Sequence, residues 1–190
     1  VFADVDGRIG RQQTGRLPIR ASGNGLLPSE IREGRDPWRG WIPYARLPAR
    51  YDPPRGWVGT CGQTTVARDD PYPYATQCAP ADRYRRLSAL LDAPGKKTPH
   101  ANWLYQRDVL NLTARDVAPV MARALLSRKE TEHLGQILNR WDGQDYAGRS
   151  APLIFQSVWI KFARRVFRDE LGPDLTSLML GIPFFWEERL

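Results

Sequence analysis

The side chains best suited to metal or redox chemistry are few in this sequence. Cys61 and Cys78 are the only cysteines, so a zinc site made of cysteines alone is excluded. His100 and His133 have no metal-ligand spacing to each other. The cysteine pair leaves two interpretations open. It forms a disulfide, which would close a loop of about 18 residues, contribute about 3 kcal/mol and imply an oxidising compartment, or it consists of two unrelated buried thiols.

Common catalytic motifs are absent from the sequence. It contains no G-x-G-x-x-G, no phosphate-binding loop, no H-E-x-x-H and no G-x-S-x-G. The acidic pairs Asp69-Asp70 and Glu187-Glu188 are sequence neighbours, whose side chains point apart on a helix or strand, and they are typical of surface charge. Nucleotide-binding, zinc-protease and α/β-hydrolase functions therefore have no support.

The composition is that of a globular chain, with 42% hydrophobic and 26% charged residues among 190. A chain of this length hides roughly 70% of its unfolded surface, so it can form a core. No apolar run approaches the ~20 residues of a membrane-spanning helix, and we expect no membrane role. The net charge of +7 is spread along the chain, which is typical of a solvated surface and predicts no nucleic-acid partner.

Two parts with different patterns are expected to position any site. Residues 1–78 hold most of the glycine and proline, which prevent long helices and favour extended segments. Their first two extended runs surround Asp6-Gly7 and predict a β hairpin with a type I′ turn. Residues 79–190 show apolar residues at helical spacing, and the longest helix is expected before the break at Gly172. The sequence predicts an α+β fold with a β-containing segment at 1–78 and a mainly helical domain at 79–190.

Several sparse motifs occur in a specific order. They are ADVDGRIGRQQTGRLPIR, GLLP, WRGWIPYARLP, YDPPRGWVGTCGQTT, DPYPY and ADRYRRLSALL. Each is weak alone, but in this order and spacing they resemble the β-subunit of penicillin acylases, the penicillin amidase family of N-terminal-nucleophile hydrolases. The strongest part of the resemblance covers residues 1–92.

The resemblance implies an amidase made as one precursor and cut into two chains, with a Ser exposed at the start of the second. The free α-amine of that Ser, with a reference pKa near 7.7–8.0, would act as the base for its own hydroxyl. Attack on an acyl-amide substrate would yield an acyl-enzyme and then a carboxylic acid. The extended part would then be a fragment of an αββα catalytic domain. No cofactor would take part in the chemistry, although the family often carries a structural calcium ion.

The expected nucleophile lies outside this chain. Val1 has no nucleophilic side chain. In the family, the segment that matches ADVDGRIG at residues 3–10 lies downstream of the catalytic Ser. We therefore expect an interior fragment of the β-subunit, inactive alone, whose partners are the α-subunit and the start of the β-subunit. Unpaired strand edges predict self-association. The family implies a periplasmic or extracellular location for the full-length protein, and no signal peptide is visible at the start.

The resemblance assigns site positions in the stretch Gly56–Thr65. In the family this stretch ends with two Asn, and the first donates its side-chain amide to the oxyanion. Gly62 and Gln63 stand at these two positions. Losing one oxyanion donor costs about 100- to 1,000-fold in rate. Three interpretations stay open: Gln63 supplies the amide, a backbone N–H turns inward, or ordinary activity is lost.

Further site positions follow from the same resemblance. Arg83 matches an Arg of the family's active-site network, where its planar fork could hold an amide oxygen or a substrate carboxylate, but it also suits a helix surface. Tyr72 and Tyr74 could line an acyl pocket or pack in the core. Asp69 and Asp70 lie near the family's calcium-binding segment without aligning to it, so we assign no metal ligand.

Two alternative functions also remain. Within the family, the chain could belong to an acyl-homoserine-lactone or cephalosporin acylase. Outside it, the helical part could be a non-catalytic basic binding module for an acidic partner.

Overall fold

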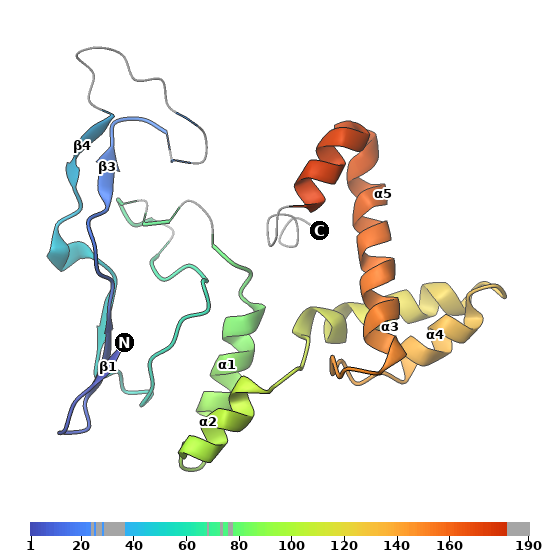
Figure 1. Ribbon diagram of the computed structural model, residues 1–190, viewed down its shortest axis with the longest axis horizontal. Helices are drawn as coiled ribbons and strands as arrows, with labels where there is room; N and C mark the ends of the chain where they lie inside the picture. The colour runs from blue at the N-terminus through green and yellow to red at the C-terminus, as the bar shows by residue number, and fades with distance from the viewer. Residues whose placement is uncertain are drawn as a thin grey trace. The chain divides into compact units, whose positions relative to one another are not determined.

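We analysed the protein in a computed structural model, which describes residues 1–23, 25, 28, 37–67, 69–72, 74–75 and 78–181 (Figure 1). The chain forms two compact units, Val1–Tyr84 and Arg85–Leu190. The division between these units falls between Tyr84 and Arg85, and the sequence-based division at residue 78 stays a prediction. The pair Glu187-Glu188 and the two leucines of GLLP lie outside the described residues.

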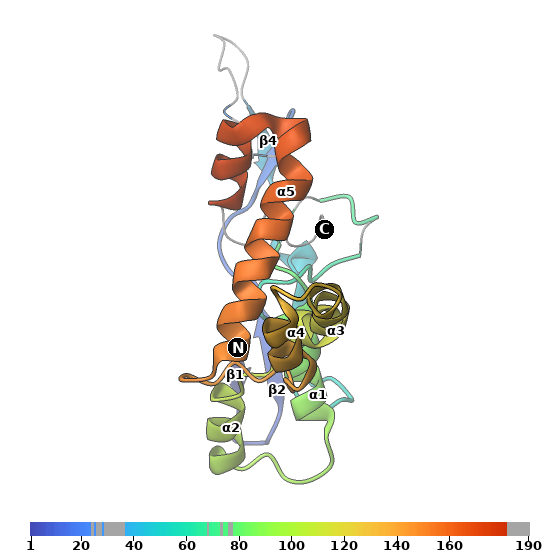
Figure 2. The ribbon, with the colours of Figure 1, turned by 90° about the vertical axis from the view of Figure 1, so that its right-hand side faces the viewer.

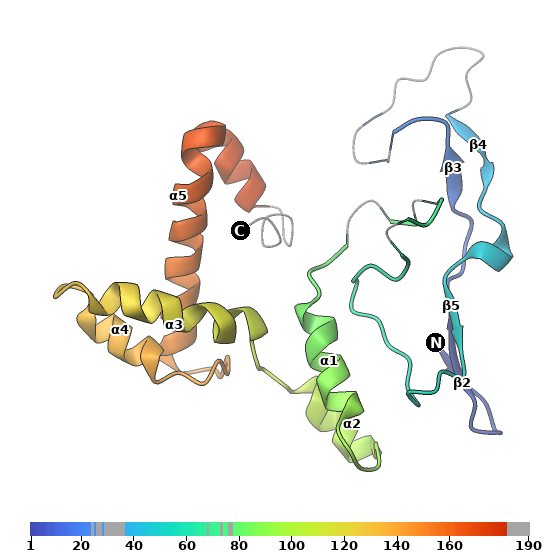
Figure 3. The ribbon, with the colours of Figure 1, turned by 180° about the vertical axis from the view of Figure 1, so that it is seen from behind.

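The described residues of the first unit form two small antiparallel sheets, and Figures 1 and 3 show their strands side by side. One sheet has the order β1-β2-β5, and the other pairs β3 with β4. A short 3-10 helix, η1, leads from β4 into β5. The bounds are Phe2–Ala3 for β1, Ile9–Gln12 for β2, Pro18–Arg20 for β3, Trp38–Trp41 for β4, Tyr44–Arg46 for η1 and Ala49–Tyr51 for β5.

The hairpin predicted around Asp6-Gly7 is confirmed, but the prediction of a type I′ turn is wrong. The N–H of Gly7 donates to the carbonyl of Asp4 at 3.2 Å, and the carboxylate of Asp4 accepts from the N–H of Arg8 at 2.8 Å. A type I′ turn needs positive φ at two residues, whereas in this turn only Gly7 has it, at 81°. The geometry fits a type I turn followed by a glycine bulge, which the Asp4 side chain stabilises.

In the described part of the chain, five helices follow the sheets, which confirms the predicted α+β class with a mainly helical second part. Helix α3 begins after Asn111, whose side-chain oxygen accepts from the N–H of Ala114 at 2.9 Å, and Thr98 caps α2 in the same way. The helix bounds are Asp82–Asp92 for α1, Pro99–Gln106 for α2, Leu112–Leu126 for α3, Glu132–Asn139 for α4 and Ser150–Leu180 for α5.

The core of the second unit lies where α3, α4 and the start of α5 meet. Figures 2 and 3 show α3 and α4 side by side, with the first turns of α5 beside them. Phe155 of α5 is only 1% exposed, and its ring centroid lies 5.6 Å from that of Trp141. Small residues on α3 allow this close packing. The buried cluster consists of Ala114, Ala118, Met121, Ala122, Leu138, Ala151 and Phe155.

The predicted break in the last helix is confirmed at Gly172. Its φ of 70° and ψ of 172° interrupt α5, and Pro173 starts the following segment. The hydroxyl of Thr176, which is 1% exposed, donates to the carbonyl of Gly172 at 2.7 Å. Before the break, α5 is only partly covered, because Ala163 is fully buried whereas Phe162 is 48% exposed.

An ion pair ties α1 to the segment before α3. The guanidinium of Arg86 donates to both carboxylate oxygens of Asp108, at 2.9 Å from Nε and 2.5 Å from Nη2. These hydrogen bonds lower the pKa of Asp108 and raise that of Arg86, with partial burial acting against both shifts. The pair is a two-point contact of the strong, charge-assisted kind.

Gly135 sets the distance between α3 and α4, and this yields a stability prediction. A Cβ at Gly135 would lie 2.8 Å from the backbone N of Leu126 and 3.0 Å from the carbonyl of Ala122. We expect Gly135→Ala to lower the free energy of unfolding of the full-length protein by about 1–3 kcal/mol, because the helices must separate. His133→Ala, at an exposed position of the same helix, is the control. Equal urea midpoints for the two variants would refute this role.

The Asp108 pair predicts a pH-dependent contribution to stability. A carboxylate whose folded pKa is lowered stabilises the protein above its ordinary pKa of 3.8, and this contribution is lost as the pH falls through the lower folded value. At pH 7 we expect Asp108→Asn to cost about 1–3 kcal/mol. The control is Asp116→Asn, because Asp116 is exposed and lies 3.8 Å from Arg115. In thermal unfolding, the stability that Asp108→Asn loses relative to the unmodified protein should shrink below pH 3.8. A loss that stays the same at every pH would contradict the role of this ion pair.

Candidate functional site

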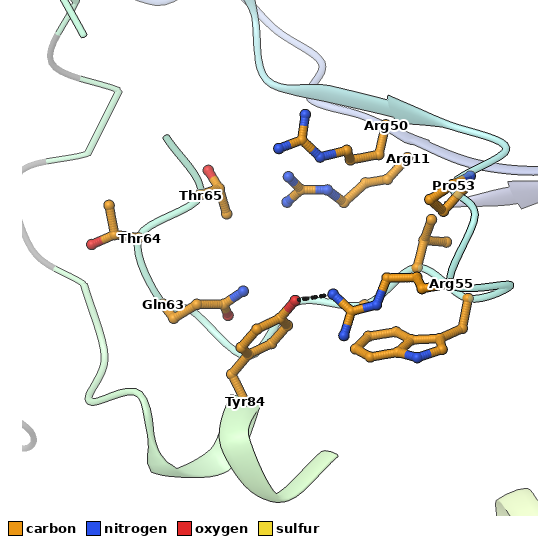
Figure 4. A pocket seen from close by; sticks show the side chains of 11 residues that line it. Arg11, Arg50, Pro53, Arg55, Gln63, Thr64, Thr65 and Tyr84 are labelled. Atoms are coloured by element: carbon orange, nitrogen blue, oxygen red, sulfur yellow. Dashed lines mark hydrogen bonds between the residues drawn. The ribbon is translucent and has the colours of Figure 1, made fainter. Parts of the chain in front are cut away.

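A cavity of about 260 Å³ lies in the first unit, beside the stretch that the resemblance assigns to the oxyanion (Figure 4). Three elements build it: the paired strands β2 and β5, the segment that follows β5, and the first turn of α1. The described lining residues are Arg11, Arg50, Pro53, Arg55, Trp57, Val58, Gly59, Gln63, Thr64, Thr65 and Tyr84.

Gly62 shapes the loop next to this cavity. Its φ is 83°, a left-handed conformation that favours glycine. Its carbonyl accepts a 2.8 Å hydrogen bond from the N–H of Ala79, and a Cβ at Gly62 would lie 3.2 Å from the Cβ of Ala79. The loop is therefore held close to the segment that leads into α1. Gly62 itself is exposed and is not one of the described lining residues.

Gln63 lines the cavity with an oriented amide. Its side-chain oxygen accepts from the N–H of Cys61 at 2.7 Å and lies 3.4 Å from the hydroxyl of Thr60. Because the oxygen is used inside the loop, the nitrogen is left as the donor, and Gln63 is one of the residues that line the cavity (Figure 4). Among the two predicted oxyanion positions, Gln63 is the one whose side chain reaches this cavity.

A stacked arrangement forms one wall of the cavity. The guanidinium carbon of Arg55 lies 3.5 Å from the ring centroid of Trp57, which is 8% exposed. A guanidinium nitrogen of Arg55 also donates to the hydroxyl of Tyr84 at 3.0 Å, as Figure 4 shows. These contacts connect the segment after β5 to the first turn of α1.

The other predicted positions are Tyr72, Tyr74 and Arg83. None of them is among the described residues that line the cavity. Arg83 is exposed on α1, and its neighbour Tyr84 lines the cavity instead. Tyr74 donates from its hydroxyl to the carbonyl of Arg46 at 2.7 Å, and its ring meets that of Tyr72 edge-on, which is a packing role. The assignment of Arg83 to the active-site network stays a prediction.

The cysteines are two free thiols in this structure. Cys61 and Cys78 are both half-buried, and no disulfide joins them. They lie one residue before Gly62 and Ala79, so both cysteines flank the hydrogen bond that holds the loop.

The acidic residues near the loop do not form a metal site by themselves. Asp70 accepts from the N–H of Tyr72 at 3.1 Å within its own turn. Within the described ranges, no group of three or more His, Cys, Asp or Glu side chains could hold a metal ion. The same part of the chain contains no helix long and apolar enough to cross a membrane.

Comparison with known proteins decides the family. A sequence model described as penicillin amidase matches residues 1–190, the whole of this chain. The chain belongs to the penicillin amidase family. The match covers the helical part as well as the motif-rich first part, so the predicted family is confirmed over the full length of the chain.

Several curated members of the penicillin amidase family are similar to this chain. An acyl-homoserine lactone acylase, QuiP, of Pseudomonas fluorescens Pf-5 is 30% identical over 188 residues, covering 92% of this chain and 23% of the relative. Penicillin acylase 2 proenzyme of Pseudomonas sp. SE83 is 33% identical over 152 residues, covering 80% of this chain and 20% of the relative. Penicillin G acylase of Escherichia coli is 28% identical over 149 residues, covering 75% of this chain and 18% of the relative. The chain spans about a fifth of the length of these relatives.

Sequence reasoning missed most of the residues that line the cavity. Arg11, Arg50, Arg55 and Tyr84 belong to segments whose pairing and packing bring them together. Trp57 did carry a signal, because a large aromatic residue in a Pro- and Gly-rich segment is expected to bury a large area. Nothing in the sequence indicated that Arg11 meets Arg50.

The close approach of Gly62 to Ala79 predicts a difference between two glycines with positive φ. Gly62→Ala must strain the backbone and also push against Ala79. Gly56→Ala must only strain the backbone, because its φ is 72° and no atom lies within 4 Å of the added Cβ. Both should destabilise the full-length protein by about 1–2 kcal/mol through φ. We expect Gly62→Ala to lose about 1 kcal/mol more. Equal losses in urea denaturation would show that the Ala79 contact does not constrain the loop.

Proposed function

We propose that this chain contributes the oxyanion side of the active site of a penicillin-acylase-like amidohydrolase. In this proposal the full-length protein cleaves a linear amide bond through an acyl-enzyme on an N-terminal Ser that lies outside this chain. The observation that carries the proposal is the oriented amide of Gln63, which sits in the stretch assigned to the oxyanion and donates toward a cavity.

The proposed reaction needs one base, one nucleophile and one oxyanion donor. The α-amine of the Ser takes the proton of its own hydroxyl, and the oxygen attacks the amide carbonyl. The Gln63 amide then donates a hydrogen bond to the negatively charged oxygen of the tetrahedral intermediate. The intermediate expels the amine, which takes the proton, and water hydrolyses the remaining ester to a carboxylic acid.

Gln63 suits this role because its orientation exists before any substrate binds. Its carbonyl oxygen is already held by the N–H of Cys61, so the amide needs no reorganisation when charge develops. The longer Gln stem also compensates for the missing side chain at Gly62. A backbone N–H as the donor, or a loss of ordinary activity, is the alternative outcome of the test below.

The substrate is proposed only as an acylated amine. The names of the relatives refer to acyl-homoserine lactones and to penicillins, which are both amides of this kind. Product release by the full-length protein from phenylacetyl, glutaryl and long-chain acyl amides would distinguish penicillin, cephalosporin and acyl-homoserine-lactone acylases.

Two substitutions separate the two roles of the Gln63 side chain, whose nitrogen is the proposed oxyanion donor and whose oxygen accepts from the N–H of Cys61. Gln63→Ala removes both, whereas Gln63→Glu keeps an acceptor for the N–H of Cys61 but replaces the donor with a negatively charged oxygen. In the full-length enzyme we expect both to lower kcat by about 100- to 1,000-fold. The thermal midpoint should change much less than kcat does, especially for Gln63→Glu.

Gln136→Ala is the matched control, because Gln136 is exposed on α4 in the second unit. Its kcat should equal that of the unmodified enzyme. If the Gln63 variants also keep full kcat, Gln63 is not the donor. If the unmodified full-length enzyme hydrolyses none of the amides tested, the proposed function itself is wrong.

A further inference from the structure

We propose that Arg11, Arg50 and Arg55 form a binding site for the oxyanion group of a small molecule, a carboxylate or a phosphate, in the cavity beside Gln63. The site does not depend on amide hydrolysis, because it rests on the charge and geometry of this cavity. Figure 4 shows the Arg11 and Arg50 guanidinium groups next to each other, extending from their strands into the same space.

The pairing of β2 with β5 places two like charges together. Arg11 lies directly opposite Arg50 in the register of these antiparallel strands. Side chains opposite each other in such a pair are close, and like charges there destabilise the sheet. An anion between the two guanidinium groups would convert this repulsion into attraction.

Arg55 adds a third positive charge that is already oriented. Stacking on Trp57 and the hydrogen bond to the hydroxyl of Tyr84 restrict its guanidinium. A restricted side chain loses little conformational entropy when it binds a ligand, so this arginine favours binding more than a mobile one would.

The remaining lining of the cavity complements an anion. Gln63 offers an amide nitrogen, and Thr64 and Thr65 offer hydroxyl groups. The described lining residues include no Asp or Glu, and no carboxylate in the described part of the chain pairs with Arg11 or Arg50. Arg11 and Arg50 therefore have no counter-ion among the described residues.

The ligand class follows from the shape of the donors. A guanidinium presents a planar fork that matches two oxygens of a carboxylate or phosphate. The cavity, at about 260 Å³, has room for a small organic acid but not for a chain segment of several residues. A small molecule with a terminal oxyanion group therefore fits better than a peptide.

The test measures binding by the full-length protein at low ionic strength. Isothermal titration with glutarate, with inorganic phosphate and with neutral glutaramide separates the two anions from an uncharged analogue of the same shape. We expect at least one anion to bind and glutaramide not to bind. Arg11→Gln and Arg50→Gln should each weaken anion binding by about tenfold or more. Arg39→Gln, which removes the same charge from an exposed position on β4, is the control and should bind like the unmodified protein.

Thermal unfolding distinguishes a small-molecule site from one that the protein fills itself. Without added anion, Arg11→Gln and Arg50→Gln should keep or raise the midpoint, because each removes a repulsion. A lowered midpoint would show that an acidic side chain from elsewhere in the protein occupies the cavity, and would overturn the proposal. Absence of binding for both anions, equal binding of glutaramide, or unchanged affinity in both arginine variants would overturn it as well.

Discussion

The hydrogen bond from the N–H of Ala79 to the carbonyl of Gly62 is the contact on which the candidate site depends. It joins a loop that has no regular secondary structure to the segment that begins α1. With the loop in this position, Gln63 reaches the cavity, and Tyr84 on the first turn of α1 reaches Arg55. A residue with a side chain at position 62 would crowd Ala79, because its Cβ would lie 3.2 Å from the Cβ of Ala79.

The same contact explains how this family member can differ from the family pattern at the oxyanion positions. Glycine at position 62 permits the left-handed backbone and the close approach, but it removes the amide that the family has there. In the proposed function the next residue compensates, because the longer Gln63 side chain has the same amide and is anchored through its oxygen. In the proposed reaction the donor therefore stands one residue later in the chain than the resemblance implies.

The cavity combines this donor with an unusual concentration of positive charge. Arg11 lies directly opposite Arg50, and like charges in this position destabilise a sheet. The stacked Arg55 adds to the same field. A site of this kind favours negative charge, whether it belongs to a bound oxyanion or to the transition state of a reaction at Gln63.

The amino-acid sequence by itself determined the class of the fold, the hairpin, the break at Gly172 and the family, because these depend on local conformation and on the order of motifs. It also indicated the stretch that contains Gln63. The type I′ turn predicted at Asp6-Gly7 was wrong, and the turn that forms is stabilised by a hydrogen bond to the Asp4 side chain that the sequence pattern did not indicate. Only the tertiary structure decided which residues surround Gln63. Arg11, Arg50 and Tyr84 are far apart in the chain, and strand register and helix packing bring them together.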